Sequence, residues 1–398
     1  METFSLGALF AFALSSAGSL SFVQSTISDL PVIGTRLNGT SLRLGGFSGL
    51  WCDPSEQGQK TRHCRTHTDR GPNLSTNSNN LFSSAEERPF AVPGYQPRWV
   101  DLEIDTETAK TKVIGMIGLH SAHGPLSGIP NLPNEDETPV DERGRALAYD
   151  PDGIDPEAIA RADDGTFWMG EEYGPSLLHF SAEGELLTRF VPEGSGRTGM
   201  NVDTQALLPS HYALRVSNRG FEALAIQGGL IFAFLQSGLK PADDSGLCRV
   251  LAWNPETSKV EAEYLYRLGS GADKIGDAVA MKTPGHFRLI EQNGKTGDDA
   301  VRRIVEIDLS IATNLVGRTG KLPETLSSSE RARAGIQVAT GRKLFDLADR
   351  GWSNVSKAEG LAPLDADANS FAIISDNDFG IGDQAHALPH IGVVRTGL

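Results

Sequence analysis

Apolar and polar positions recur in short blocks along the chain. Five segments share a small residue or glycine, a polar or acidic residue and then an apolar pair, and each precedes a second apolar run that ends in polar residues and glycine. Short apolar runs bounded by turn residues predict strand, turn, strand in every unit. The five first segments are GGFSGLWCD (45–53), DPEAIAR (155–161), GFEALAI (220–226), IGDAVAM (275–281) and KAEGLAP (357–363).

The second runs and the hairpins between units complete the repeat. Alternating segments such as RWVDLEID and RRIVEIDL supply further strands, and four strands per repeat are typical of propeller blades. We therefore predict an all-β chain that forms a single β-propeller of about five four-stranded blades, with room for a sixth in 92–150 or 310–356. The second runs are RTHTDRG (65–71), TFWMGEEYG (166–174), IFAFLQSG (231–238), FRLIEQNG (287–294) and FAIISDNDFG (371–380).

A propeller also needs a strand that closes the ring. We predict that an N-terminal strand within RLNGTSLRLG (36–45) pairs with PHIGVVRTG (389–397) in the last blade. One segment, ETLSSSERARAG (324–335), has the pattern of a helix.

Composition and charge narrow the class of partner. The chain has 44 glycines, 21 prolines and only 7% aromatic residues, which favours many turns over long helices. A formal net charge of −15 disfavours nucleic acid and anionic membrane surfaces, which attract basic proteins. We expect a monomer that acts on a small molecule, with no nucleic acid partner and no membrane insertion. An acidic protein is suited to holding cations.

The N-terminus and the cysteines bear on the compartment. An apolar run followed by small residues predicts a signal peptide over 1–19, too short to span a bilayer, and a secreted or periplasmic protein whose propeller domain covers 20–398. Three cysteines do not make a disulfide framework. Cys52 and Cys64 either pair across neighbouring strands or remain, with Cys248, unpaired thiols; the sequence leaves both open.

The repeated polar position carries the candidate chemistry. The innermost strand of each blade lines the central channel, so a carboxylate at its recurring position predicts a ring of carboxylates. Such a ring repels itself unless a hard cation with oxygen ligands, such as calcium, neutralises it. The alternative is that these residues cap turns or form hydrogen bonds with neighbouring backbone amides. The recurring position holds Ser48, Glu157, Glu222, Asp277 and Glu359, and the predicted metal ligands are Glu157, Glu172, Glu222, Asp277, Glu291, Glu359, Asp376 and Asp378.

Several blocks taken together resemble a known family. HTDRGPN, DPEAIARADDGTFWMGEEYGPSLLHFSAEGELL, NRGFEALAI, VEAEYLYRL, KAEGLAPL and IISDNDFG are similar, in order and spacing, to the phytase-like family described as having esterase-like activity of phytase. The likeness runs from about Gly45 to Gly380. It implies an exported propeller that hydrolyses phosphoric or carboxylic esters. The chain departs from the family pattern at Thr68, before Asp-Arg-Gly, and around Asp277.

Basic residues beside the acidic blocks suggest how such a site acts. Arg70, Arg219 and Lys357 are predicted to neutralise charge on the reacting ester, with Asp69 beside Arg70 at the channel end of the first blade. The leading hypothesis is therefore a calcium-assisted hydrolase of phosphoric or other anionic esters. Two alternatives are a non-catalytic, calcium-stabilised propeller that binds a ligand or protein, and a calcium-dependent lactonase. For each basic residue the competing interpretation is a salt bridge that only fixes the channel wall.

Other catalytic motifs are disfavoured. Residues 62–71, RHCRTHTDRG, place a cysteine and an arginine as cysteine-dependent phosphatases do, but a turn follows where that mechanism needs a helix. We therefore interpret Cys64 as a strand residue. The chain has no Gly-x-Ser-x-Gly elbow. His120 and His123 lie in a loop and are interpreted as surface residues.

Overall fold

The computed structural model describes residues 20–74, 86–355, 357–381 and 388–396. The predicted signal peptide, 1–19, lies outside these residues. Four antiparallel strands form the first large sheet, in which alternating residues of each central strand are buried, as the period of two requires. These strands are β4 (Phe47–Cys52), β5 (Thr61–Thr68), β7 (Arg98–Asp105) and β8 (Thr111–Gly118).

Three further large sheets follow along the chain. The second contains β12 (Pro156–Arg161), β13 (Phe167–Glu171), β14 (Ser176–Phe180), β15 (Leu186–Pro192) and β16 (Thr204–Leu208), the last parallel to β15. The third, of eight strands, contains β17 (Phe221–Gln227), β18 (Leu230–Leu235), β19 (Leu247–Asn254), β20 (Lys259–Arg267), β21 (Lys274–Ala280), β22 (His286–Gln292), β23 (Arg302–Asp308) and β24 (Ala339–Asp346). The fourth contains β25 (Lys357–Pro363), β26 (Ser370–Asp376), β27 (His390–Arg395) and β1 (Ser21–Thr26).

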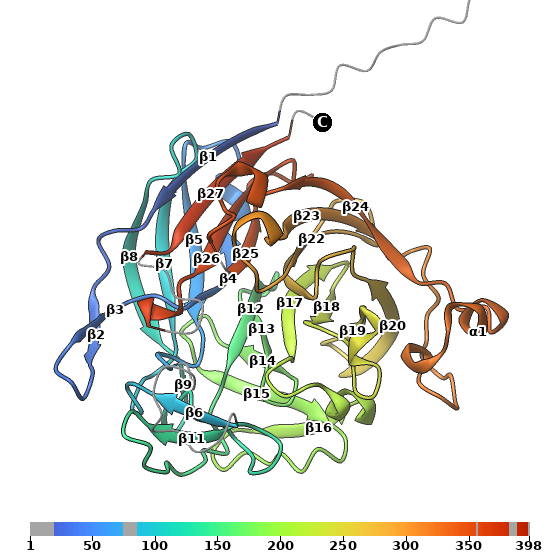
Figure 1. Ribbon diagram of the computed structural model, residues 1–398, viewed down its shortest axis with the longest axis horizontal. Coiled ribbons are helices and arrows are strands. Elements are labelled where there is room, and N and C mark those ends of the chain that lie inside the picture. Colours follow the sequence, from blue (N-terminus) through green and yellow to red (C-terminus); the bar gives the residue numbers. More distant parts are fainter. Residues whose placement is uncertain (1–19, 75–85, 356, 382–387, 397–398) are drawn as a thin grey trace, which may run out of the picture.

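The innermost strands close a ring. β4 contacts β12, β12 contacts β17, β17 contacts β21, β21 contacts β25, and β25 returns to β4. The sheets radiate from this ring, as Figure 1 shows. Apolar side chains fill the space between neighbouring sheets, for example Trp99 against Phe167 and Phe190 against Trp253. The chain is therefore an all-β propeller, as the repeat predicts.

The strand that closes the ring differs from the prediction. β1 (Ser21–Thr26) pairs with β27 through its full length, from Ser21 opposite Arg395 to Thr26 opposite His390. The predicted segment, 36–45, instead contributes β3 (Ser41–Arg43), which pairs only with β2 (Val32–Thr35). Both segments alternate in polarity. The sequence pattern alone does not distinguish a strand that continues a sheet from one that forms a separate hairpin.

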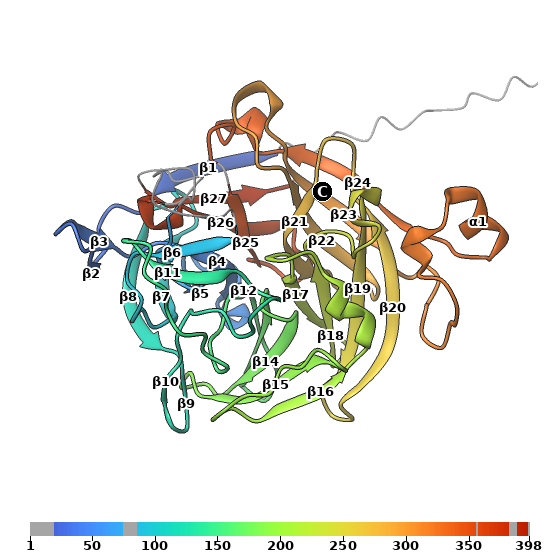
Figure 2. The same cartoon turned by 60° about the horizontal axis from the view of Figure 1, so that its bottom comes forward.

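Smaller elements lie around the ring. β6 (Glu87–Phe90) pairs in parallel with β11 (Thr138–Asp141), and β9 (His120–Ser121) pairs with β10 (Gly124–Pro125). Helix α1 (Ser328–Arg333) confirms the predicted helical segment and begins with a capping box between Ser327 and Glu330. The segment that carries α1 projects from the rim of the propeller (Figures 1 and 2).

Cys52 and Cys64 form a disulfide across β4 and β5, where they are opposite one another in the ladder. The bridge resolves the alternative that the sequence leaves open. It also confirms that Cys64 is a strand residue and excludes it as a free thiolate nucleophile. Cys248 is buried and unpaired.

Removing this bridge should lower the stability of the fold. The two cysteines are 12 residues apart, and a loop of that length corresponds to about 2–3 kcal/mol of lost unfolded-state restriction. We expect a Cys52→Ser, Cys64→Ser variant to unfold in urea with a free energy lower by this amount. The Cys248→Ala variant should respond to added reductant as the natural protein does. Equal stability of the natural protein with and without reductant would contradict the prediction.

A charged cavity at the centre of the propeller

Each inner strand contains an irregularity near the ring. The pairing register shifts around Glu157 in β12, Glu222 in β17 and Glu359 in β25, so each glutamate is the extra residue of a β-bulge. A bulge inserts one unpaired residue and re-aims its side chain. All three glutamates therefore line the same central cavity.

Asp277 lies outside the cavity because β21 is offset by one residue. Its register shift falls around Gly276, not Asp277. A Cβ on Gly276 would lie 2.3 Å from the carbonyl oxygen of Ala358, so no larger residue fits there. Asp277 consequently faces away from the cavity and accepts hydrogen bonds from the backbone N–H groups of Ala278 and Leu361. A shift of one residue reverses the face of a strand.

Glu291, opposite Ile275 in the β21–β22 ladder, also lies outside the cavity wall. Its carboxylate accepts hydrogen bonds from the Tyr266 hydroxyl at 2.5 Å and from the Gly269 N–H at 2.8 Å. These bonds hold Glu291 against the end of β20 and the turn that follows it. Asp277 and Glu291 thus serve backbone and side-chain hydrogen bonding, the alternative that the sequence leaves open for each acidic residue.

The cavity has a volume of about 190 Å³ and its wall consists of charged and amide side chains. Ten of the twelve predicted site residues lie in it. These are Asp69, Arg70, Glu157, Glu172, Arg219, Glu222, Lys357, Glu359, Asp376 and Asp378. The other residues of the wall are Asn73, Arg88, Asn218, Gln236 and Lys274.

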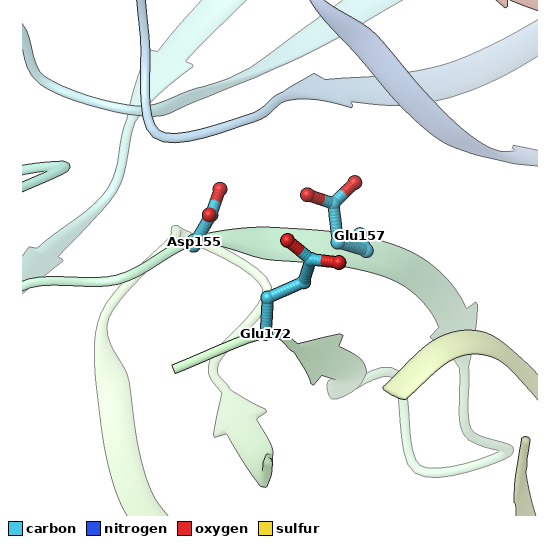
Figure 3. A group of neighbouring side chains, drawn as sticks. All are labelled: Asp155, Glu157 and Glu172. Atoms are coloured by element: carbon cyan, nitrogen blue, oxygen red, sulfur yellow. The ribbon is translucent and has the colours of Figure 1, made fainter. Parts of the chain in front are cut away.

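The carboxylates converge in two groups. Oxygens of Asp155, Glu157 and Glu172 lie within 4.8 Å of one another, and so do oxygens of Glu157, Glu222 and Glu359. Figure 3 shows the first group, with its three carboxyl groups turned toward a common space. Among the described residues, no side chain donates a hydrogen bond to, or forms an ion pair with, any of the four glutamates. Four carboxylates without partners are unusual in a protein interior.

Burial and mutual repulsion act on these groups. Burial, together with the neighbouring carboxylates Asp155 and Glu222, raises the pKa of Glu157 well above its ordinary value. Burial and Asp155 raise the pKa of Glu172 to about 7, and burial and Glu359 raise that of Glu222. The protein alone therefore does not stabilise the ionised cluster, and an additional positive charge would do so.

Two of the three predicted basic residues are already paired. Arg70 lies 2.6 Å from Glu137 and 3.2 Å from Asp155, and Lys357 lies 2.7 Å from Asp376 and 2.5 Å from Asp378. Burial would lower the pKa of Lys357, but these two carboxylates outweigh burial and raise it well above its ordinary value. Arg70 and Lys357 therefore form the salt bridges that are expected of basic residues that only fix the channel wall.

Arg219 and Lys274 differ from that pair. Within the ranges that the structure describes, neither forms an ion pair with a carboxylate. Arg219 donates to the Gln236 side chain, and Lys274 is buried in the cavity wall without a hydrogen-bond partner in the same ranges. Both cations act on Glu222, whose pKa they lower against the effect of burial. They are therefore available to an anion that enters the cavity.

Other groups support the wall. Asp69 accepts a hydrogen bond from the Gly71 N–H at 2.9 Å, which fixes the turn after β5. Glu137 binds both Arg70 and Arg88. Burial would raise the pKa of Glu137, but these arginines lower it to about 2. Glu137 lies in the segment 128–153, which is rich in proline and aspartate, so this segment is anchored directly at the cavity.

Sequence reasoning missed Lys274, Asp155 and Glu137. A signal for Lys274 exists, because it precedes Gly276 by the same two residues as Lys357 precedes Glu359. Asp155 is two residues before Glu157 and directly before β12, a spacing that in a regular strand would place both side chains on the same face. His123 is exposed in the turn between β9 and β10, as expected.

Comparison with known proteins identifies a protein family that matches this chain. A family model described as "Phytase-like: Esterase-like activity of phytase" matches residues 43–379. An "Uncharacterized secreted protein" of Arthroderma benhamiae is 25% identical over 163 residues, which cover 37% of this chain and 32% of the relative. The aligned segment thus spans about a third of the length of that relative.

Similar solved structures include a luciferin-regenerating enzyme, the RS223 β-xylosidase and the Dos1 propeller. Their TM-scores are 0.38, 0.42 and 0.34, each with 8% sequence identity. The matches cover 94%, 87% and 92% of this chain and 95%, 91% and 82% of the other. Structures with so little similarity to this chain do not indicate its activity. No helix among the described residues is long and apolar enough to cross a membrane.

Proposed function

Because the chain belongs to the phytase-like family, we propose that its central cavity is the active site of a metal-assisted hydrolase of phosphoric or other anionic esters. One observation carries the proposal: four glutamates that have no ion pair or side-chain hydrogen bond among the described residues lie in the same cavity as two cations without an ion pair there, Arg219 and Lys274. The carboxylates suit a metal ion. The cations suit the negative oxygens of an ester.

The cluster fits a hard cation. Its groups consist of carboxylates alone, without histidine or cysteine, and oxygen ligands of this kind are those that calcium prefers. Oxygens bound to one calcium ion lie up to about 5 Å apart, which agrees with the 4.8 Å limit within each group. Glu172 Oε1 and Glu222 Oε2 are buried without a hydrogen-bond partner. A calcium ion would satisfy both atoms.

The residues of the chain would divide the work. Glu157, Glu172, Glu222 and Glu359 would hold the metal, and Arg219 and Lys274 would bind the oxygens on which negative charge grows as water attacks and the alcohol leaves. A divalent cation bound there would lower the pKa of a water molecule and polarise the ester. Asp69, Arg70, Lys357, Asp376 and Asp378 would keep the wall of the cavity in place through their hydrogen bonds and ion pairs.

We also propose five blades, obtained by counting the eight-stranded sheet as two. Among the described strands, the hydrogen-bonded ladder joins its halves through one short pairing, of Tyr266 and Arg267 in β20 with Ala339 and Thr340 in β24. Each half then supplies one inner strand to the ring. In this count two inner strands, β4 and β21, have no carboxylate at their bulge, since the extra residues there are Gly49 and Gly276. Lys274 lies at the beginning of β21.

Export is part of the proposal. The leader pattern over 1–19, the Cys52–Cys64 disulfide and the description of the Arthroderma benhamiae relative as secreted support a secreted or periplasmic protein, since disulfides persist in oxidising compartments. We expect a monomer.

The proposed function can be tested by measuring ester hydrolysis by protein from which metal ions have been removed. We expect turnover of para-nitrophenyl phosphate, bis-para-nitrophenyl phosphate or phytate to appear when calcium is added to chelated protein and to vanish on renewed chelation. Para-nitrophenyl acetate serves as the neutral ester for comparison. If no ester is hydrolysed while calcium still raises the melting temperature, the hydrolase proposal fails and a calcium-stabilised binding propeller replaces it.

A further inference from the structure

Two groups of carboxylates meet in the cavity and have only Glu157 in common. The first group comes from a single sheet: Asp155 precedes β12, Glu157 is in β12, and Glu172 follows β13. The second group comes from three sheets, because Glu157, Glu222 and Glu359 belong to the inner strands β12, β17 and β25. The two groups therefore differ in what a bound ion would connect.

Each group contains its own unsatisfied oxygen. Glu172 is 2% exposed, and its Oε1 has no hydrogen-bond partner in the described part of the chain. Glu222 is 1% exposed, and its Oε2 likewise has none there. A buried acceptor without a partner loses its hydration without compensation, at a cost of about 1–3 kcal/mol or more for a charged group. One ion in one group would leave the unsatisfied atom of the other group unexplained.

The charges of the side chains around the cavity also favour two bound ions. Arg70, Arg88 and Lys357 form ion pairs with four carboxylates, Glu137, Asp155, Asp376 and Asp378, so these groups together carry one negative charge when ionised. Asp69 and the four glutamates add five negative charges, and Arg219 and Lys274, which have no ion pair among the described residues, add two positive charges. The ionised groups thus have an excess of four negative charges, which two divalent cations balance.

We propose that the cavity binds two divalent cations of the calcium type, one in each carboxylate group, with the Glu157 carboxylate shared between them. This inference rests on the proposed metal-assisted function. It specifies the number of ions and assigns each a position. The ion held by Glu157, Glu222 and Glu359 links three sheets, so it should contribute more to thermal stability than the ion held by Asp155, Glu157 and Glu172 within one sheet.

Calcium stoichiometry tests the inference directly. Chelated full-length protein would be dialysed to equilibrium against calcium, with bound ion measured by atomic emission. We expect two equivalents for the natural protein, one for Glu172→Gln and one for Glu222→Gln. Glu157→Gln should bind neither ion at the concentration that saturates the natural protein. Glu183→Gln, an exposed turn residue, is the control and should bind two.

Melting temperatures distinguish a variant that has lost a calcium ligand from one that binds little calcium because it is poorly folded. Without calcium, Glu172→Gln and Glu222→Gln should melt no lower than the natural protein, because each removes a buried repelling charge. With calcium, the rise in melting temperature should shrink more for Glu222→Gln than for Glu172→Gln. One equivalent in the natural protein, with esters still hydrolysed, would overturn the second ion only. Two equivalents with no ester hydrolysed would retain this inference and reject the hydrolase.

Discussion

Glu157→Gln is expected to lower kcat/KM for calcium-dependent ester hydrolysis by at least about 1000-fold, the equivalent of roughly 4 kcal/mol of transition-state stabilisation. Among the described residues, Glu157 alone has oxygens that belong to both carboxylate groups. An amide keeps the size of the side chain but supplies one neutral oxygen in place of a charged carboxylate. Steady-state kinetics on the best ester of the panel, over a range of calcium concentrations, would measure the loss.

The same variant should be more stable than the natural protein when calcium is removed. Carboxylates whose oxygens lie within 4.8 Å of one another repel by a few kcal/mol when ionised near a protein surface, so loss of one charge should raise the free energy of unfolding by about 1–3 kcal/mol at alkaline pH. Chemical denaturation in chelator would show it. A calcium-free variant less stable than the natural protein would mean that Glu157 has a structural partner instead of a repelling neighbour.

Asp277→Asn is the matched control. It also replaces a buried carboxylate on an inner strand, but Asp277 accepts two backbone hydrogen bonds outside the cavity. Its amide would turn a donor toward one backbone N–H, at a cost of about 1–3 kcal/mol. We expect lower stability with and without calcium, and an unchanged rise in melting temperature on calcium binding. The two carboxylates thus separate a ligand from a structural acceptor.

The contrast between Glu157 and Asp277 also shows which features the sequence pattern could predict and which it could not. The repeat predicted the propeller and the inner strands because short apolar runs with turn residues recur in all five units. It placed Glu157, Glu222 and Glu359 correctly in the cavity. It did not distinguish Asp277 from them, because the position of a bulge depends on the close approach of Gly276 to Ala358 across two strands. That contact cannot be inferred from the spacing of residues in the sequence.

The same offset explains the basic residues. Aligning Asp277 with the glutamates moves Lys274 out of register with Lys357, although both precede the bulge by two residues. The pattern therefore predicted Lys357, which is paired with Asp376 and Asp378, and missed Lys274, which has no such partner among the described residues. Which lysine is free depends on the acidic residues of other strands, and these are distant in sequence. Pairing of this kind is set by tertiary structure.

Lys357→Met should therefore act on stability. It would leave the buried Asp376 and the partly buried Asp378 without the cation they share, which costs about 3 kcal/mol for a buried pair. Any loss of turnover should follow the fraction of unfolded protein.

Lys274→Met should leave the fold intact and lower kcat/KM for para-nitrophenyl phosphate by about 100-fold, the usual effect of removing one donor to a developing negative charge. Methionine matches the length of the lysine side chain, and no carboxylate among the described residues loses an ion-pair partner. The loss should decrease with the charge of the substrate, from monoester to diester to neutral acetate. Lys274→Arg should recover part of the activity because it restores the cation. Equal losses on all three esters would show that Lys274 does not bind the anionic group, and a loss of stability as large as that of Lys357→Met would assign it to the wall of the cavity.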